Sequence, residues 1–273
     1  MASRWERGTG GLCANAFKTS MWGWSGVSAV VDGVSIAMWS GPRNISTAMM
    51  YSFDNREDCF ASDEPLYSHY LARTGINHPG ADAVITHHDA DADSVVDYLT
   101  GEIPEDARVW YQKHMCHHIL SEMETKWLNS LNNCFLIRSP REVLLSLSRI
   151  TDEVSLWATG LPQQVRLLQQ VARESGEIPP IMDARDVLED PRGMLGLLCE
   201  RVGIPFSERM LSWRSGPREC DGIWAEHWYD SVWSSTGFSP YKDRPGNLSP
   251  EHEAILSEAL PLYESMHSLR MTL

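Results

Sequence analysis

The sequence predicts an α/β fold in which helices cover both faces of a central parallel sheet, giving three layers. Short apolar runs such as Val34–Trp39 and Asn133–Arg138 are each followed by a stretch with helical periodicity. Gly160–Ser175 is amphipathic with the helical period and precedes a further apolar run. Strands and helices therefore alternate along the chain, a pattern typical of parallel, doubly wound sheets.

The first half of the chain has the clearer elements. The run Val34–Trp39 leads into the turn SGPRNIST, and a helix is expected to begin near Ser46 and Thr47. Other strands are expected to end at Asp63-Glu64-Pro65, Lys113 and Arg138, with helices over Ala92–Leu99 and Pro140–Arg149. Residues 74–92 are expected to form a polar connection, and Ile103-Pro104-Glu105 a turn.

The second half is more helical. Helices are expected over Gly160–Ser175, Pro191–Val202 and Ser249–Leu269, with one strand at Pro180–Asp183 and an irregular, aromatic-rich stretch over Trp213–Phe238. Residues 1–33 are rich in Gly, Ser and Ala without a sustained period, which predicts a poorly ordered extension. Residues 34–273 are expected to form a single domain.

Composition narrows the function classes. The formal net charge of −14 argues against nucleic acid and anionic membranes as partners, because both favour basic patches. No apolar run reaches the roughly eighteen residues of a membrane span, and six cysteines show no CxxC pair. We therefore expect a soluble, cytoplasmic protein with reduced thiols. A homodimer is one open option for its assembly.

The turn Ser40–Thr47 has the features of an anion site. A turn between strand and helix presents unpaired amides and the positive end of the helix dipole. Gly41 would allow close approach, and Arg43 offers a fork of donors. The G-K-[ST] ending of a nucleotide triphosphate loop is missing. The segment alone fits an anion site and a plain helix cap about equally well.

At these residues the sequence resembles the PAPS-dependent sulfotransferases, whose donor loop reads P-[KR]-S-G-[ST]-T. Pro42, Arg43, Ser46 and Thr47 match it, while Asn44 and Ile45 replace the usual Ser and Gly. The stretches WSGPRNISTAMMYSF, DEPLYSHYLARTG and HPG look like a bacterial small-molecule branch of that superfamily. The resemblance implies a P-loop-like fold and donor binding by Gly41, Pro42, Arg43, Asn44, Ile45, Ser46 and Thr47.

A second motif lies in NCFLIRSPREVLLSLSRI. An arginine at the carboxyl end of a strand lies in the crevice where open α/β sheets bind ligands. Arg138, Pro140 and Ser146 match the superfamily's R-x-P-x-x-x-x-x-S pattern. The resemblance implies that Arg138 and Ser146 hold the 3′-phosphate that distinguishes PAPS from ordinary nucleotides. Without it, an arginine paired with a nearby carboxylate is the ordinary interpretation.

The reacting centre needs charge stabilisation and a base. Sulfuryl transfer is similar to phosphoryl transfer, and Arg43 is the candidate to stabilise the leaving phosphate, with Lys113 as a helper. For the base, the resemblance implies either His114, after the strand that carries the histidine of cytosolic sulfotransferases, or Glu64, where several other sulfotransferases place a glutamate. The choice stays open, with His114 slightly preferred. No metal is expected, because the histidines near His114 lack an acidic partner motif.

The aromatic-rich region supplies further candidates. Thr236 and Phe238 resemble residues that flank the adenine, and Lys242 and Arg244 resemble a basic loop at the 3′-phosphate. Trp224 and Trp228, with Glu64 and His69, are the candidates for acceptor binding, although aromatic residues most often build core. The expected activity is sulfuryl transfer from PAPS to a hydroxyl or amine of a small molecule, leaving PAP. The acidic charge leaves room for a cationic natural product. A nucleotide or small-molecule kinase, or a non-catalytic nucleotide-binding protein, is the alternative.

Overall fold

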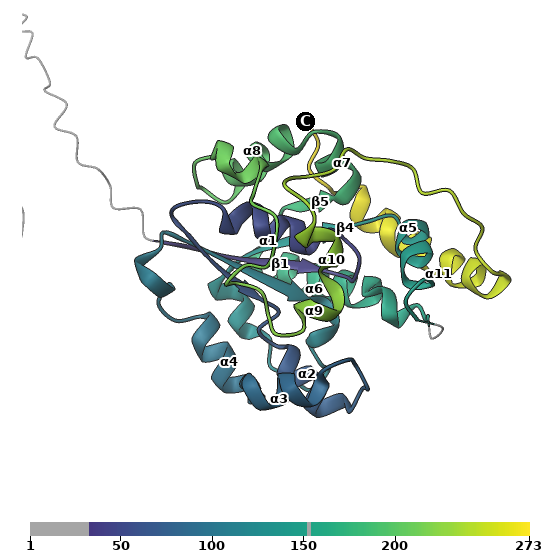
Figure 1. Cartoon of the computed structure of the whole chain (residues 1–273), viewed down its shortest axis with the longest axis horizontal. Helices are drawn as coiled ribbons and strands as arrows, with labels where there is room; N and C mark the ends of the chain where they lie inside the picture. The colour runs from purple at the N-terminus through teal and green to yellow at the C-terminus, as the bar shows by residue number, and fades with distance from the viewer. Residues whose placement is uncertain (1–32, 152–153) are drawn as a thin grey trace, which may run out of the picture. The chain divides into compact units, whose positions relative to one another are not determined.

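A computed structural model of the chain describes residues 33–151 and 154–273, so the extension predicted for residues 1–33 lies outside it apart from Gly33. In the described part, five strands form one parallel sheet in the order β2-β3-β1-β4-β5 (Figure 1). The strands are β1 (Val34–Ser40), β2 (Cys59–Asp63), β3 (Val109–Met115), β4 (Asn132–Ile137) and β5 (Ile181–Asp183). Because β1 lies between β3 and β4, the chain changes direction across the sheet there. A ligand crevice is expected at the carboxyl ends of these strands.

The helices connect the strands. They are α1 (Ser46–Asp54), α2 (Tyr67–Thr74), α3 (Ala81–His87), α4 (Ala92–Leu99), α5 (Pro140–Leu147), α6 (Leu161–Ser175), α7 (Ala184–Glu189), α8 (Pro191–Arg201), α9 (Ala225–Trp228), α10 (Asp230–Trp233) and α11 (Pro250–His267). Short 3-10 helices lie at Pro104–Asp106, Cys116–His118, Lys126–Ser130, Trp157–Thr159 and Glu208–Leu211. None of the helices in the described part is both long and apolar enough to cross a bilayer.

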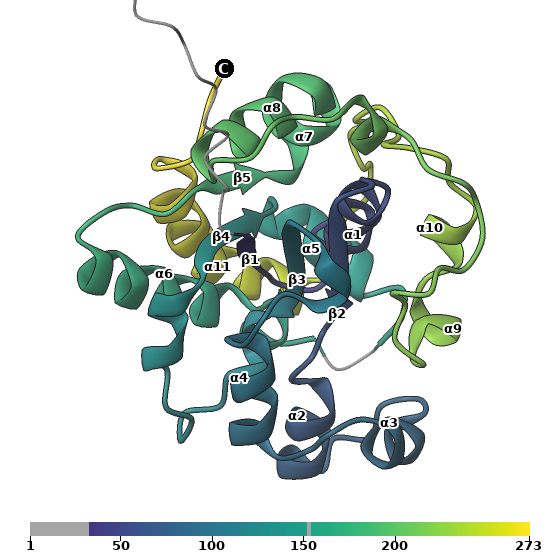
Figure 2. The same ribbon diagram turned by 90° about the vertical axis from the view of Figure 1, so that its left-hand side faces the viewer.

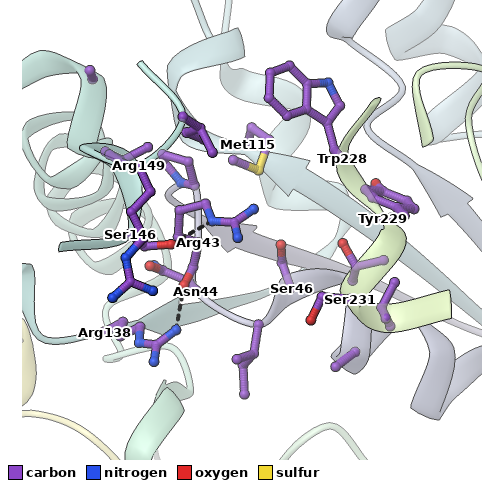
Figure 3. Close-up of a pocket in the computed structure, with 18 of the residues that line it drawn as sticks. Arg43, Asn44, Ser46, Met115, Arg138, Ser146, Arg149, Trp228, Tyr229 and Ser231 are labelled. Carbon is purple, nitrogen blue, oxygen red and sulfur yellow. Dashed lines mark hydrogen bonds between the residues drawn. The ribbon is translucent and has the colours of Figure 1, made fainter. Parts of the chain in front are cut away.

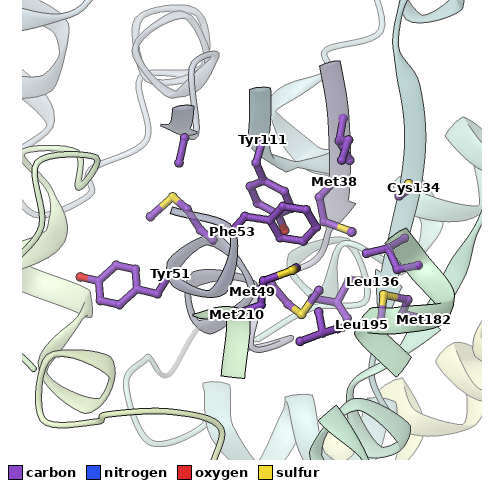
Figure 4. Close-up of a cluster of buried hydrophobic side chains, with 14 of the residues drawn as sticks. Met38, Met49, Tyr51, Phe53, Tyr111, Cys134, Leu136, Met182, Leu195 and Met210 are labelled. Atoms are coloured by element: carbon purple, nitrogen blue, oxygen red, sulfur yellow. The ribbon is translucent and has the colours of Figure 1, made fainter. Parts of the chain in front are cut away.

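Two hydrophobic cores fill the space between the layers. Successive side chains of a strand point to opposite faces, so Met38 enters one core and Trp39 the other. The first core joins the sheet to α1, α7 and α8, as Figure 4 shows for the packing around Met49 and Phe53. The second joins it to α4, α6 and α11 (Figure 2). The predicted three-layer α/β fold is confirmed.

Most predicted elements are present, and the exceptions have a common cause. The helix over Ala92–Leu99 has the predicted bounds, and every predicted strand lies within two residues of its place. The sequence analysis missed α2, α3 and α7. These helices have six to eight residues, and α3 buries only Val84, so their periodic signal is weak. The irregular stretch over Trp213–Phe238 contains the single-turn helices α9 and α10.

Candidate active site

A cavity of about 1450 Å³ opens at the carboxyl edge of the sheet. Its lining comes from the segments that follow β1, β2, β3 and β4, together with the aromatic segment around α9 and α10. Figure 3 shows two contrasting sides: Arg43, Arg138 and Arg149 lie on one, and Trp228 and Tyr229 on the other. The volume exceeds the range usual for one drug-sized ligand, roughly 300–1,000 Å³. Two ligands have room to bind side by side.

The turn after β1 has an unusual backbone. Arg43 has φ 66° and Ile45 φ 59°, so both lie in the left-handed region, where a non-glycine residue costs about 1–3 kcal/mol. Ile45 occupies the N-cap position of α1 and makes no side-chain capping hydrogen bond to that helix. Plain helix capping by Ser46 or Thr47 is therefore not what this turn does. Ile45 replaces the glycine of the donor-loop pattern and still takes a conformation that suits glycine.

Gly41 has a different role from the one predicted. It is buried and does not line the cavity, and a Cβ atom there would come within 2.4 Å of the Thr159 carbonyl oxygen. Gly160, the next residue after Thr159, also approaches it closely, because a Cβ atom on Gly160 would lie 2.8 Å from the Gly41 Cα. The missing side chain thus lets the Trp157–Thr159 turn approach the loop. It does not open the loop to an anion.

Hydrogen bonds join the turn to α5. The Nε of Arg43 donates to Ser146 Oγ at 2.9 Å, and Arg138 donates from a terminal nitrogen to the Arg43 carbonyl oxygen at 2.9 Å (Figure 3). The Asn44 side chain donates to the Leu136 carbonyl at 3.0 Å, and its own buried Oδ1 has no hydrogen-bond partner in the described part of the chain. The two sequence motifs therefore form one connected structure.

Positive charge accumulates on this side of the cavity. Arg244 and Lys242 line it with the arginines named above, and Arg138 also pairs with Glu142 on α5 at 3.3 Å. Burial lowers the pKa of Arg43, and the neighbouring Arg138 lowers it further. Burial also lowers the pKa of Arg244, as do Arg138 and Arg43. Arginines that repel one another in a partly buried cavity form a site suited to an anion.

A compact charged cluster lies beneath the aromatic side. The Lys113 ammonium contacts Asp63 Oδ1 at 2.7 Å, Glu64 Oε1 at 2.6 Å and the Tyr229 hydroxyl at 2.6 Å. Burial raises the pKa of Glu64 and the negative Asp63 raises it further, against the attraction of Lys113. Burial lowers the pKa of Lys113, but the pull of Asp63 and Glu64 outweighs it and leaves that pKa well above its ordinary value. Glu64, at φ 42°, is held in a strained backbone conformation at the cavity wall.

Comparison with known proteins identifies the family. A family model described as a sulfotransferase domain matches residues 34–270, most of the chain. The chain belongs to this sulfotransferase family. Residues 34–270 include the whole cavity lining, so the arginine side and the Glu64 cluster both lie within the matched domain.

Curated relatives of this sulfotransferase carry a different label. Two proteins of Arabidopsis thaliana, named branched-chain-amino-acid aminotransferase-like proteins 1 and 2, are 35% and 34% identical to it. The matches cover 85% and 84% of this chain but only 41% and 40% of the relatives. The chain thus spans about two fifths of their length. A solved sulfotransferase from Alicyclobacillus acidocaldarius superposes with a TM-score of 0.50 at 12% identity, covering 88% of this chain and 97% of its own. That likeness supports the fold.

The sulfotransferase brings most of the predicted residues to one cavity. Those lining it are Pro42, Arg43, Asn44, Ile45, Ser46, Thr47, Glu64, Lys113, Arg138, Ser146, Trp224, Trp228, Phe238, Lys242 and Arg244. Phe238 also packs edge-on against Trp213, with ring centroids 5.1 Å apart. Thr236 does not line the cavity. It is exposed, and its carbonyl accepts from the Trp213 amide.

Besides Gly41 and Thr236, the structure places two more predicted residues away from the cavity lining. His114 is 1% exposed, stacks on Trp39 at 4.3 Å and hydrogen-bonds Gln112 through Nε2 at 3.2 Å. Burial lowers its pKa to about 3, so it stays neutral. A base must reach the acceptor, and this position argues against His114 in that role. His69 is likewise buried, with Nδ1 3.0 Å from the Ala90 carbonyl oxygen, and does not contact the cavity.

The aromatic side contains residues that the sequence analysis did not place. Tyr67 and Tyr70 on α2 stack against His118, with ring centroids 5.0 and 4.8 Å apart. Burial lowers the pKa of His117 to about 4 and that of His118 well below its ordinary value. Neutral rings therefore form this wall. The further lining residues are Tyr67, Tyr70, His78, His117, His118, Arg149, Trp157, Tyr229 and Ser231. The missed helix α2 is why its tyrosines were not placed.

Proposed function

We propose that this sulfotransferase moves a sulfuryl group from PAPS to a hydroxyl or amine of a small-molecule acceptor. The main support for this proposal is the group of arginines on one side of the cavity, which concentrates positive charge there although the chain has a net charge of −14. Burial and the charge of Arg138 lower the pKa of both Arg43 and Arg244, and a bound polyanion would relieve that repulsion. The donor is such a polyanion.

The donor fits the arginine side in one orientation. Arg138 and Ser146 lie together at the α5 edge, where they would hold the 3′-phosphate, with Arg244 facing them. Ser46 and Thr47 lie at the first turn of α1, where the helix dipole and free amides favour the other phosphate. Arg43 belongs to the turn between these two phosphate positions and contacts Ser146, so its guanidinium could interact with either phosphate. The orphaned Oδ1 of Asn44 offers one more polar contact.

Glu64 is the proposed base. Its Oε1 accepts from Lys113, while the polar neighbour of Oε2 among the described residues is His118 Nε2, at 3.9 Å. In the transfer, Oε2 accepts the acceptor's proton as the acceptor oxygen or nitrogen forms its bond to sulfur. The bond from sulfur to the phosphate oxygen breaks, and the leaving phosphate keeps the electron pair. Arg43 then stabilises the added negative charge. A raised pKa makes Glu64 a stronger base once it is ionised.

The acceptor is proposed to bind on the aromatic side. Trp224, Trp228 and Tyr67 line that side, and the charged cluster lies beneath them. The acidic composition favours a neutral or cationic acceptor, and this remains a prediction from the sequence. A kinase is the second candidate, but no lysine precedes Ser46 and Thr47, where a nucleotide triphosphate loop requires one.

Calorimetry tests the donor. PAP, ATP and AMP are titrated into the protein without magnesium. We expect PAP to bind at least about tenfold more tightly than AMP, because a phosphate held by arginines contributes more than 1.4 kcal/mol. Preference for ATP would favour the kinase. Absence of binding by any of the three nucleotides would leave a protein without a nucleotide site and contradict the proposal.

Product analysis tests the chemistry. The protein is incubated with PAPS and a panel of alcohols, phenols and amines, and PAP release is followed together with the mass of sulfated products. We expect Glu64→Gln to reduce turnover by about a hundredfold or more, since a general base contributes 10²–10⁴. Its PAP affinity should be unchanged, because Glu64 lies on the other side of the cavity. Full turnover by Glu64→Gln would remove Glu64 from the base role.

A further inference from the structure

Lys113, Asp63 and Tyr229 form a closed ring of hydrogen bonds. Lys113 donates to the Tyr229 hydroxyl at 2.6 Å and to Asp63 Oδ1 at 2.7 Å, and the Tyr229 hydroxyl donates to Asp63 Oδ2 at 2.7 Å. All three side chains are buried, with Lys113 and Asp63 each 1% exposed. A ring of buried, mutually satisfied groups holds its members in one geometry.

The ring uses up the donors of Lys113. An ammonium has three N–H donors, and the third goes to Glu64 Oε1 at 2.6 Å. None remains for a donor phosphate, so Lys113 acts on the reaction through Glu64. The sequence analysis expected a direct contribution to charge stabilisation, and the contacts point to this indirect one.

The ring also sets the electrostatics of Glu64. Two carboxylates share one ammonium, so the cluster has one surplus negative charge when all are ionised. The groups facing Glu64 are Asp63 beside it on the chain, Lys113 within β3, His118 in the turn after β3, Tyr67 on α2 and Tyr229. Asp63 is the only other carboxylate among them, and its charge opposes ionisation of Glu64.

The same ring connects the base to the acceptor wall. Tyr229 lies between α9 and α10, whose residues Trp228, Ser231 and Val232 line the cavity. Asp63 Oδ2 also accepts from the Gly222 amide at 3.1 Å, which fixes the beginning of that segment. Asp63 thus holds the aromatic segment at two points while it contacts Lys113.

We propose that Asp63 and Tyr229 are positioning residues: they aim the Lys113 ammonium at Glu64 Oε1, which leaves Oε2 turned to the acceptor, and they seat residues 222–232 against that base. This rests on the proposed function, in which Glu64 takes the acceptor's proton. Neither residue touches the donor side, so the ring should govern turnover and leave donor binding alone.

The experiment combines three variants with two measurements. Glu64→Gln, Asp63→Asn and Tyr229→Phe are compared by PAP calorimetry and by the pH dependence of PAP release from PAPS with the best acceptor of the panel. Tyr263→Phe is the matched control. It removes a tyrosine–aspartate hydrogen bond of 2.8 Å to Asp183 at the end of β5, outside the cavity lining.

The expected results are specific to positioning. Asp63→Asn should move the acid limb of the rate profile to lower pH, because loss of the Asp63 charge lowers the pKa of Glu64. Tyr229→Phe should reduce kcat by about ten- to a hundredfold, the effect of losing a hydrogen bond to a charged group. PAP affinity should be unchanged in both, and Tyr263→Phe should change neither measurement.

A double variant excludes a purely structural tether. If Tyr229 acts through Glu64, Tyr229→Phe should cost nothing further in a Glu64→Gln background. Additive losses, or an unmoved acid limb in Asp63→Asn, would overturn the proposal. If Asp63→Asn does not fold, the comparison of Tyr229→Phe in the wild-type and Glu64→Gln backgrounds tests the proposal by itself. The results also distinguish failure of the proposed base from failure of the positioning role. Wild-type turnover in Glu64→Gln would contradict Glu64 as the base. Reduced turnover in Glu64→Gln with a further, additive loss from Tyr229→Phe would contradict only the positioning role of the ring.

Discussion

The Nε of Arg43 donates to Ser146 Oγ at 2.9 Å, across 103 positions of sequence. The contact joins the turn after β1 to the last turn of α5, and Arg138, which directly follows β4, donates to the Arg43 carbonyl oxygen. In the proposed function, Ser146 would contact both the 3′-phosphate and Arg43, which stabilises the leaving phosphate. The hydrogen bonds connect residues of the proposed donor site that come from distant parts of the chain.

Ser146→Ala should weaken PAP binding more than AMP binding. The variant removes a hydroxyl that would donate a hydrogen bond to the 3′-phosphate, and it also removes the hydrogen-bond partner of Arg43. We therefore expect PAP affinity to fall by about tenfold. Calorimetry with both nucleotides measures the difference. Ser148→Ala, two residues further on and exposed, is the matched control and should bind PAP like the wild type. An equal loss for PAP and AMP would place Ser146 away from the 3′-phosphate.

Glu142→Gln should strengthen PAP binding and destabilise the free protein. Glu142 neutralises the buried Arg138 at 3.3 Å, so its removal leaves an unpaired cation that an anion can satisfy. We expect the free energy of unfolding to fall on the order of 3 kcal/mol and PAP affinity to rise roughly tenfold. Urea unfolding with and without PAP measures both. Glu253→Gln breaks the exposed pair with Arg141 and should change neither value appreciably. Weaker PAP binding by Glu142→Gln would mean that Glu142 orients Arg138 more than it competes for it.

Gly41→Ala should destabilise the fold and the donor loop together. The new methyl group would come within 2.4 Å of the Thr159 carbonyl oxygen, and backbone atoms cannot move aside cheaply. We expect a loss of about 1–3 kcal/mol in the free energy of unfolding, as overpacking usually costs. Gly196→Ala is the contrasting variant, because α8 has open space there, and the helix should gain about 0.5–1 kcal/mol. If the free energy of unfolding of Gly41→Ala equals that of the wild type, the Trp157–Thr159 turn can shift to accommodate the methyl group, which contradicts the prediction.

Local signals explain what the sequence predicted well. The apolar runs of β1 and β4 and the capped, periodic stretch Ala92–Leu99 specify their elements within a few residues, so their bounds were found. The motif that contains Arg138 and Ser146 also lies within one strand–helix unit. Such features need no knowledge of distant contacts.

The remaining features depend on contacts across the fold. Tyr229 reaches Lys113 across 116 positions and Asp63 across 166, and no local pattern records these distances. The choice of base is a different case. Lys113 and His114 are neighbours on β3, so their side chains point to opposite faces, and only Lys113 can meet Asp63. The alternation of a strand was visible in the sequence and would have argued that Lys113 and His114 cannot serve the same site.

His114→Phe should remove part of the pH dependence of stability. Burial holds the pKa of His114 at about 3, whereas in the unfolded chain it is about 6.5. Below about pH 6.5 the unfolded state therefore binds the proton and the folded state does not, so stability is full above that pH and falls as pH declines. The loss from this residue is about 1.4 kcal/mol at pH 5.5. Urea unfolding at pH 8 and pH 5.5 should show a difference smaller by that amount in His114→Phe than in the wild type. PAP affinity and turnover should persist, because the ring stacks on Trp39 outside the cavity lining. A variant that folds, binds PAP and has lost turnover would return His114 to the reacting centre.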